Sequence, residues 1–309
     1  MKVNELYKVS VKPEIWLGIG SKHWNELQGT ADKPVYLLSH PMWHFGLKSA
    51  WLYRKLHNML AKKHVKLIML MNTTAEQRLG KWAGLDSHFI NQNIHVCEHK
   101  FHVAHNGSRK HEAVYIAAAQ PYKRLQLAKN IKNLFVITYF WPDVRNDKGE
   151  WDLHAFEPSI AHADFNRHRI GQEEINRILN DSVCGLALSK KEGAMLASLE
   201  YQLSGLPVVT TRSLGGRDVF LDPRHTVWVR DDAASVAEGV RQMVKAQHDP
   251  ALIRKHTLEN LEVHRRKFYD LVCRIFSESG ETVPAYEAFH KHIWGPPLGV
   301  GAIATRYKS

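Results

Sequence analysis

The chain has 309 residues, long enough for two domains, and its hydrophobic fraction of 44% and charged fraction of 24% are typical of a globular protein. Its 42 Lys and Arg against 31 Asp and Glu give a net charge of +11, which predicts an anionic partner: nucleic acid, a membrane surface or a phosphorylated small molecule. The three cysteines are too few and too scattered for a disulfide framework or a zinc site. Because no apolar run reaches membrane-spanning length, we expect a cytoplasmic protein that would touch a membrane only at its surface.

The sequence pattern in the first third of the chain predicts a small α/β unit, equivalent to half of a doubly wound parallel sheet. Residues 1–32 carry little periodicity and are expected to be irregular. After them, short apolar runs alternate with longer amphipathic stretches, which is typical of strands alternating with helices. The expected strands are 35–38 and 65–71, and the expected helices are 47–61 and a second one from Thr73 or Thr74 to near Gly84.

A polar stretch, residues 91–111, is interpreted as the connection between two domains, with the boundary near residue 110. It is rich in histidine, at His95, His99, His102, His105 and His111. These histidines lack carboxylate or cysteine companions at the spacing that metal ligands require. We therefore expect solvated linker side chains here and no metal site.

The rest of the chain predicts a second series of strands and helices around a parallel sheet. The expected strands are 113–118, 134–139, 184–188 and 207–210, and the expected helices are 122–131, 172–179, 194–203, 233–246 and 250–277. Such a sheet binds ligands beyond the carboxyl ends of its strands. The chain thus divides into 1–110, a first domain with its linker, 111–276, a ligand-binding domain, and a tail, 277–309.

The window 188–216 carries the most informative motif. Glu192 precedes a predicted helix and Glu200 lies within it, eight positions further on. Eight helical residues rise about 12 Å, which is the reach of a nucleoside diphosphate. The amides of Gly193, Ala194 and Met195 would form the helix N-terminus, where unpaired N–H groups favour a diphosphate. Glu192 would then lie near one end of such a ligand and Glu200 near the other.

This window resembles the donor site of retaining glycosyltransferases with the GT-B fold, in particular glycosyltransferase family 4. In that family a strand is followed by a loop with Glu-Gly and by a helix with a second Glu eight positions on. The resemblance implies that Glu192 lies near the sugar of the donor and Glu200 near its ribose hydroxyls. Further similar segments are NRILN at 176–180, SGLPVV at 204–209 and GGRD at 215–218. The resemblance covers residues 85–245 and implies two Rossmann-like domains facing a cleft, with an abbreviated first domain and a tail that returns to it.

Two further cations follow the strand 113–118. Lys123 and Arg124 open a predicted helix, where positive charge opposes the helix dipole, so they indicate an anionic ligand. In the family, an Arg and then a Lys five residues later neutralise the donor diphosphate. Lys123 takes the Lys position, whereas Ala118 stands where the Arg is expected, which leaves the site one cation short.

The resemblance also assigns residues to the sugar and the acceptor. His40 directly follows the strand that begins at Val35 and reaches Ser39. In many family members a histidine at this place lies beside the sugar and the acceptor. Gly215 and Gly216 are expected to let a loop approach the ligand closely, with Arg217 and Asp218 near the acceptor or the sugar. Glu192, His40 and Lys123 are thus the predicted catalytic residues.

The implied reaction is transfer of a sugar from a nucleotide diphosphate donor to a hydroxyl of a glycan or glycolipid, with retention. No Asp-x-Asp motif lies near a strand end, so we expect neither a metal nor another cofactor. One rival hypothesis keeps the fold as a non-catalytic glycan- or nucleotide-binding protein, because of Ala118 and the short first domain. Another, a nucleic-acid-binding protein, rests on the charge alone, and we expect no nucleic-acid partner.

Overall fold

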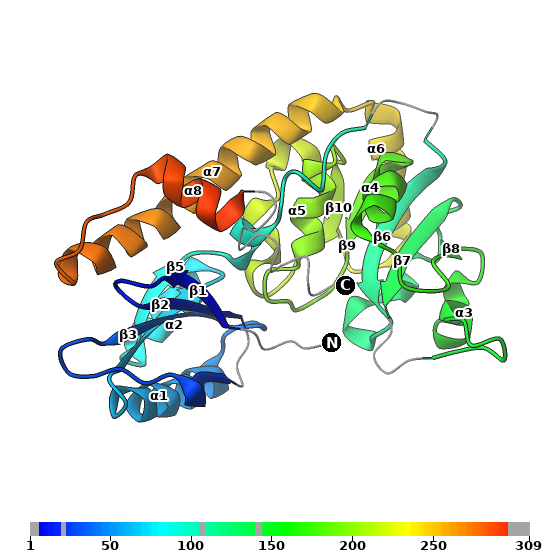
Figure 1. Cartoon of the computed structure of the whole chain (residues 1–309). Helices are drawn as coiled ribbons and strands as arrows, with labels where there is room; N and C mark the ends of the chain where they lie inside the picture. Colours follow the sequence, from blue (N-terminus) through cyan, green and yellow to red (C-terminus); the bar gives the residue numbers. More distant parts are fainter. Residues whose placement is uncertain (1–5, 20–22, 105–108, 140–143, 296–309) are drawn as a thin grey trace.

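A computed structural model of the chain contains two α/β regions, each built on its own β-sheet (Figure 1). The structure describes residues 6–19, 23–104, 109–139 and 144–295. Residues 1–5 and 20–22 of the segment expected to be irregular, His105, and residues 296–309 of the predicted tail lie outside these described residues.

The first sheet has five strands in the order β1-β2-β3-β4-β5, so its neighbours in space are also neighbours in sequence. The strands are β1 (Leu6–Ser10), β2 (Ile15–Ile19), β3 (Val35–His40), β4 (Val65–Met71) and β5 (Asp86–Phe89). β1 is antiparallel to β2, and the other pairs are parallel. The helices α1 (Leu47–Ala61) and α2 (Thr74–Trp82) make the crossovers from β3 to β4 and from β4 to β5.

Alternate residues of the interior strand β4 pack into two different cores. Leu67 and Met69 join Leu56 of α1 in a core that belongs to the first region. Ile68 and Leu70 point to the opposite face and join the large core of the second region. The first sheet is therefore buried on both faces, which explains the nearly continuous apolar run of β4.

The second sheet has six parallel strands in the order β11-β10-β9-β6-β7-β8. They are β6 (His111–Ala118), β7 (Leu134–Tyr139), β8 (Asp164–Phe165), β9 (Ser182–Ala187), β10 (Val208–Thr211) and β11 (Thr226–Val229). Numbered within this region, the order is the doubly wound Rossmann order, which reverses between β6 and β9. The expected two parallel-sheet regions, the first of them abbreviated, are thus confirmed.

The remaining helices are α3 (Leu153–Phe156), α4 (Gln172–Asn180), α5 (Leu196–Leu203), α6 (Ala233–Ala246), α7 (Pro250–Glu278) and α8 (Tyr286–Trp294). Short 3-10 segments are η1 (His23–Glu26), η2 (Gln92–His95), η3 (Pro121–Lys123), η4 (Leu125–Ala128), η5 (Pro158–Ile160), η6 (Gly216–Phe220) and η7 (Pro223–His225). The long α7 packs on α5 and ends beside the first sheet, where Tyr36 Oη lies 3.2 Å from Ser279 Oγ (Figure 1). His292 Nε2 of α8 lies 3.2 Å from the carbonyl of Val9 in β1.

Residues 1–32 and the segment after β6 differ from their predicted secondary structure. Residues 1–32 are not irregular throughout, because β1 and β2 form an antiparallel pair that extends the first sheet. The helix expected at 122–131 is replaced by η3 and η4, with Arg124 between them in the left-handed conformation at φ 54°. The structure also contains elements that were not predicted, namely β5, β8, β11, α3 and α8. The strands among them have at most four residues, too few to show an alternating pattern.

Candidate active site

The strand order reverses between β6 and β9, and α/β sheets bind ligands in a crevice at the carboxyl ends of such strands. Crossovers on either side of such a point leave in opposite directions, so the segments that follow these two strands flank an opening in which α/β sheets bind ligands. η3 is the first segment after β6, and the loop 188–195 follows β9. The topology alone therefore brings Lys123 and Glu192 to the same edge.

Lys123 and Glu192 form a buried ion pair at this crevice. Lys123 Nζ donates to Glu192 Oε1, and the two residues are only 4% and 6% exposed. Tyr115 Oη of β6 donates to the carbonyl of Lys123 at 2.5 Å, which fixes the backbone of η3. A loop carboxylate facing a ligand would contribute little to stability, but one that compensates a buried ammonium contributes to the fold as well.

The loop that carries Glu192 is held by a short ladder to residues 214–216. Leu214 N donates to the carbonyl of Lys190 at 3.0 Å, and Glu192 N donates to that of Leu214 at 3.0 Å. Gly215 lies at φ +103°, and a Cβ there would lie 1.8 Å from the carbonyl oxygen of Glu192. Only glycine satisfies both conditions, so Gly215 permits the close approach of two loops.

Glycines also bring the second region into direct contact with the first. A Cβ on Gly193 would lie 2.4 Å from the carbonyl oxygen of Met42, in the loop after β3. A Cβ on Gly216 would lie 2.4 Å from Cβ of Asn72, which follows β4. The carboxyl ends of the two sheets thus face one another across these glycine contacts.

Three buried asparagines that the sequence analysis missed join the two regions. Asn91 Nδ2 donates to the carbonyls of Asn72 (3.0 Å) and Gly216 (2.9 Å). Asn93 Nδ2 donates to the carbonyl of Ala194 at 3.1 Å. The available signal was their position, since Asn72 directly follows β4 and Asn91 lies two residues after β5, at the ligand-binding edge of a parallel sheet.

The helix after the loop is shorter than predicted. α5 begins at Leu196, and Met195 adopts the left-handed conformation at φ 49°, so Gly193 and Ala194 lie in the loop. The prediction of eight helical residues between the two glutamates was therefore wrong. Glu200 lies in the middle of α5 and is buried.

Tyr139, at the end of β7, is a second residue that the sequence analysis missed. Tyr139 is 43% exposed overall, but desolvation of its hydroxyl raises the pKa, and the charges of Glu192 and then Glu200 raise it further. The phenol is therefore neutral, at the end of β7 and opposite Ala118 of β6.

Contrary to the prediction, Arg124 does not lie at the start of an α-helix, and its side chain is held by residues that follow or end neighbouring strands. Its guanidinium donates to the carbonyl of Leu188 and to Thr211 Oγ1, both at 2.6 Å, and pairs with Asp231 at 2.9 Å. These partners tie η3 to the ends of β9 and β10. Its contact with a diphosphate stays a prediction.

Arg217 is held between two loops. It is fully buried at 0% exposure and donates to the carbonyls of Ser189 (2.6 Å) and Thr211, while Nε pairs with Asp218 Oδ1 at 2.7 Å. The planar guanidinium thus joins the loops after β9 and β10. Asp218 keeps a partly exposed carboxylate, and the place of both residues near the acceptor or the sugar stays a prediction.

His40 lies at the predicted strand end but is enclosed. Its Nδ1 lies 3.1 Å from the carbonyl of Leu70, and its Nε2 lies 3.2 Å from His95 Nε2. A carbonyl only accepts, so Nδ1 of His40 carries the proton and His95 donates to Nε2. Burial lowers the pKa of His40 to about 3 and that of His95 well below its ordinary value. The expectation that His95 is a solvated linker residue was wrong.

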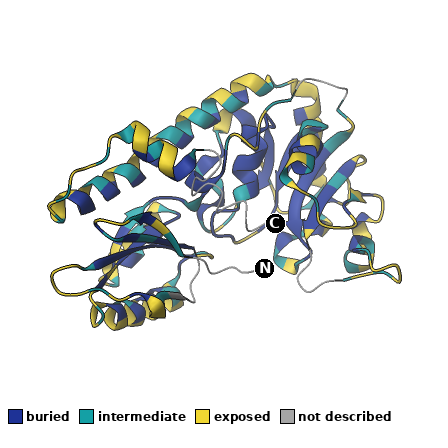
Figure 2. Cartoon of the chain, in the orientation of Figure 1, coloured by how far each residue is buried: buried dark blue, intermediate teal, exposed yellow. Residues whose placement is uncertain are grey.

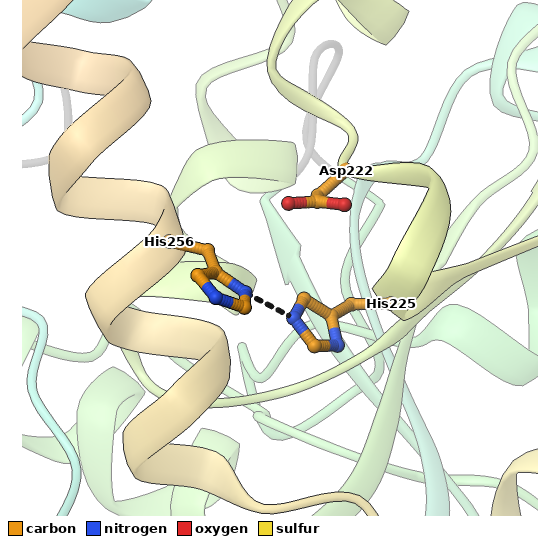
Figure 3. A group of neighbouring side chains, drawn as sticks. All are labelled: Asp222, His225 and His256. Carbon is orange, nitrogen blue, oxygen red and sulfur yellow. Dashed lines mark hydrogen bonds between the residues drawn. The ribbon is translucent and has the colours of Figure 1, made fainter.

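One group of metal-ligand type lies elsewhere among the described residues, at the amino end of the second sheet. Ligand atoms of Asp222, His225 and His256 lie within 4.8 Å of one another, and His225 Nε2 is 2.9 Å from His256 Nδ1 (Figure 3). Arg224 already pairs with the Asp222 carboxylate and lies 3.3 Å from His256 Nε2. A cation would have to displace this guanidinium, and the group is remote from the crevice.

No family model matches the sequence, and no curated protein matches it. Solved structures do match. TarM has a TM-score of 0.60 at 18% identity, over 83% of this chain and 54% of TarM. HepE from Anabaena, in complex with UDP, has a TM-score of 0.58 at 11% identity, over 77% of this chain and 72% of HepE.

A pneumococcal O-GlcNAc transferase, GtfA, in complex with UDP and GlcNAc, has a TM-score of 0.53 at 12% identity, over 81% of this chain and 54% of GtfA. This chain spans about half the length of TarM and GtfA. The chain therefore has the GT-B fold, with an abbreviated first region.

Proposed function

We propose that this protein is a retaining glycosyltransferase that moves a sugar from a nucleotide diphosphate donor to a hydroxyl of a glycan or glycolipid, without a metal ion or other cofactor. The observation that carries the proposal is the Lys123–Glu192 pair at the crevice of a doubly wound sheet, opposite the carboxyl end of a second sheet. The strand order and the sequence motif both favour the carboxyl edge of the second sheet as the donor site.

Donor binding exchanges the counter-ion of Lys123. The diphosphate replaces Glu192 as the anion beside the ammonium, which lets a buried cation keep a partner throughout. Glu192 is released to accept hydrogen bonds from the sugar hydroxyls, and Glu200 accepts those from the ribose. Gly193, Ala194 and Met195 contribute backbone amides toward the diphosphate.

Charge stabilisation and positioning supply the catalysis. As the bond to the sugar breaks, negative charge grows on the diphosphate, and Lys123 stabilises it in a site that excludes water. The departing phosphate takes the proton of the acceptor hydroxyl. The close loops at Gly215 and Gly216 orient the acceptor side, with Asp218 at its margin and His40 as a neutral group behind it.

UDP is the first ligand to test, because the matching HepE and GtfA complexes contain it. A thermal-shift screen with UDP, GDP and ADP should show stabilisation by one of them, since a ligand at 100 times its dissociation constant adds about 2.7 kcal/mol. Transfer from the matching nucleotide sugar should persist in EDTA. Stabilisation by none of them would overturn the proposal, and turnover that depends on Mg²⁺ or Mn²⁺ would overturn its metal-free form.

A second candidate is a binding protein of the same fold without catalysis. Ala118 favours it, because this buried residue ends β6 where the family places an arginine. Nucleotide binding without transfer or hydrolysis of any nucleotide sugar would support this alternative.

The location of the protein is also part of the proposal. Among the described residues, no helix is long and apolar enough to cross a membrane. We propose a cytoplasmic enzyme in peripheral contact with the membrane, where a glycolipid acceptor would lie, and with no nucleic-acid partner.

A further inference from the structure

Large apolar side chains are exposed on the first region, around α1. Leu47, Trp51 and Leu52 of this helix are 69%, 62% and 59% exposed, and Trp82 at the end of α2 is 78% exposed. Figure 2 shows exposed residues along the outer side of α1. Single exposed apolar residues are ordinary, but a group of this size on one helix face marks an interaction surface.

The same face is basic and has no negative charge in its own segment. Between Asp32 and Glu76 the sequence has seven Lys or Arg residues and no Asp or Glu. Lys48, Lys55 and Lys62 of this segment are exposed, and Lys55 Nζ lies 3.5 Å above the ring of Trp51. Cations interleaved with Trp and Leu are typical of helices that lie in the headgroup layer of an anionic bilayer.

The outer face of α1 is turned away from its core. Ala50, Tyr53, Leu56 and Leu60 pack inward, at positions three or four residues apart. The exposed apolar and basic residues occupy the opposite side of the helix. Arg54 Nη1 donates to the carbonyl of Gly84 at 2.5 Å, so the end of α2, with Trp82, lies beside this face.

The apolar face reaches the candidate active site. Trp43 precedes α1, is half exposed, and packs edge-on against Tyr122 of η3 with ring centroids 5.1 Å apart. Trp43 lies in the loop before α1, whereas Leu47 and Trp51 lie about one turn apart on the helix. Exposed apolar side chains therefore extend from the neighbourhood of Tyr122 along α1.

We infer that this α1 face, defined by Trp43, Leu47, Trp51, Leu52 and Trp82 with Lys48, Lys55 and Lys62, docks the protein on an anionic phospholipid surface. The charge of the face selects this occupant, because an anionic headgroup layer attracts the lysines while the indoles and leucines enter the boundary with the acyl chains. A lipid-anchored acceptor would then reach the crevice beside Trp43, a link that rests on the proposed function.

Vesicle co-sedimentation of the full chain tests the inference without any turnover. The wild type should bind vesicles of phosphatidylcholine with phosphatidylglycerol, bind phosphatidylcholine alone far more weakly, and lose binding at high salt. Lys48→Glu combined with Lys55→Glu should weaken binding by at least roughly tenfold, since each cation near the surface is worth about fivefold. Leu47→Ser combined with Trp51→Ser should weaken it to a similar extent.

Matched controls lie on the second region. Lys245→Glu with Lys255→Glu changes the net charge by the same amount as the α1 lysine variant. Val244→Ser with Val263→Ser removes exposed apolar groups from α6 and α7. Both controls should keep wild-type binding. Equal binding to both vesicle types, or equal losses in the controls and the α1 variants, would overturn the inference.

Two other results separate the inference from its rivals. Dimerisation in light scattering that the α1 substitutions abolish, without vesicle binding, would assign the face to a second copy and overturn the inference. Nucleotide binding in the α1 variants should equal that of the wild type. Vesicle binding by a protein that binds no nucleotide would leave the inference standing and remove the proposed function.

Discussion

The two sheets of this protein differ in strand order, and the difference separates their roles. The first sheet runs from β1 to β5 without a reversal, whereas the second reverses between β6 and β9. Only a reversal opens a crevice at the carboxyl edge. The second sheet carries the buried ion pair at that crevice, while the first presents the neutral His40 and the amide of Asn72.

Under the proposed function, the second region binds the charged part of the ligand, and the first region holds the loops of the second in place. The first region supplies Asn72, Asn91 and Asn93, which hold the loops of the second region. Among the described residues of the first region, the buried Glu76 has His44 and backbone amides as its partners, and no lysine or arginine. Four predictions test this division of roles between the two regions, beginning with the change that should have the largest effect.

The largest effect should come from Glu192→Gln. It leaves a buried ammonium uncompensated, so we expect a loss of about 3 to 5 kcal/mol in the free energy of unfolding, measured by denaturant titration. Transfer should fall by roughly 10²- to 10³-fold. The double variant Lys123→Met with Glu192→Gln should recover most of the stability but none of the transfer. Recovery of both would assign the pair to structure alone.

Gly215→Ala should be the next most severe change. The added Cβ meets the carbonyl oxygen of Glu192 and the backbone has positive φ, so we expect a loss of about 3 kcal/mol and a displaced Glu192. Gly149→Ala is the matched control, because Gly149 also has positive φ but has no atom within 4 Å of an added Cβ among the described residues. Its melting temperature should fall much less. Equal shifts would show that the loop contact contributes nothing.

The neutral histidine pair should make stability depend on pH. The folded pKa of His40 is about 3, below the unfolded value of about 6.5, so the unfolded state binds more protons between these values. The stabilising effect of the neutral ring is therefore complete above pH 6.5. It declines as the pH falls, by about 1.4 kcal/mol per pH unit for each such histidine.

Denaturant titrations at pH 6.5 and 5.5 measure this slope. The window lies above the titration of ordinary carboxylates, so histidines dominate it. His40→Gln with His95→Gln should give a shallower slope than the wild type. An unchanged slope would mean that other groups, and not this pair, carry the dependence.

The smallest effect should come from Asn91→Ala. Its amide bridges the carbonyls of Asn72 and Gly216, and leaving two buried acceptors unpaired costs about 1 to 3 kcal/mol. Nucleotide affinity should change little, because the charged pair stays intact. Transfer should fall, because the two regions are no longer held in the same relative position. Asn130→Ala, at an exposed position, is the control. A variant with normal transfer would show that the asparagine bridge does not position the reaction.

The elements with strong patterns were predictable. β4 (Val65–Met71), α1 (Leu47–Ala61) and α6 (Ala233–Ala246) have the predicted bounds, because an unbroken apolar run or a clear helical period defines each. The segment after β6 misled the analysis, because its composition suits a helix while Arg124 adopts a left-handed conformation set by distant partners.

The site was predictable where chemistry and motif coincide, and not where contacts are remote. Lys123 and Glu192 were both predicted and the structure pairs them. Asn91 bonds to Gly216 across 125 positions of sequence, and no local pattern shows such a contact. The burial of Arg217 among backbone carbonyls also depends on contacts that are remote in sequence, such as the one with Ser189.

Calorimetric titration of UDP into the wild type, Lys123→Met and Lys129→Met tests the central claim most directly. The account predicts binding to the wild type and to Lys129→Met, whose changed residue is exposed, and affinity reduced roughly 10- to 100-fold in Lys123→Met, as expected for a lost charged hydrogen bond. Melting curves confirm that each variant is folded. Equal affinity in all three proteins, or no binding of UDP, GDP or ADP by the wild type, would contradict the assignment of the crevice to a nucleoside diphosphate.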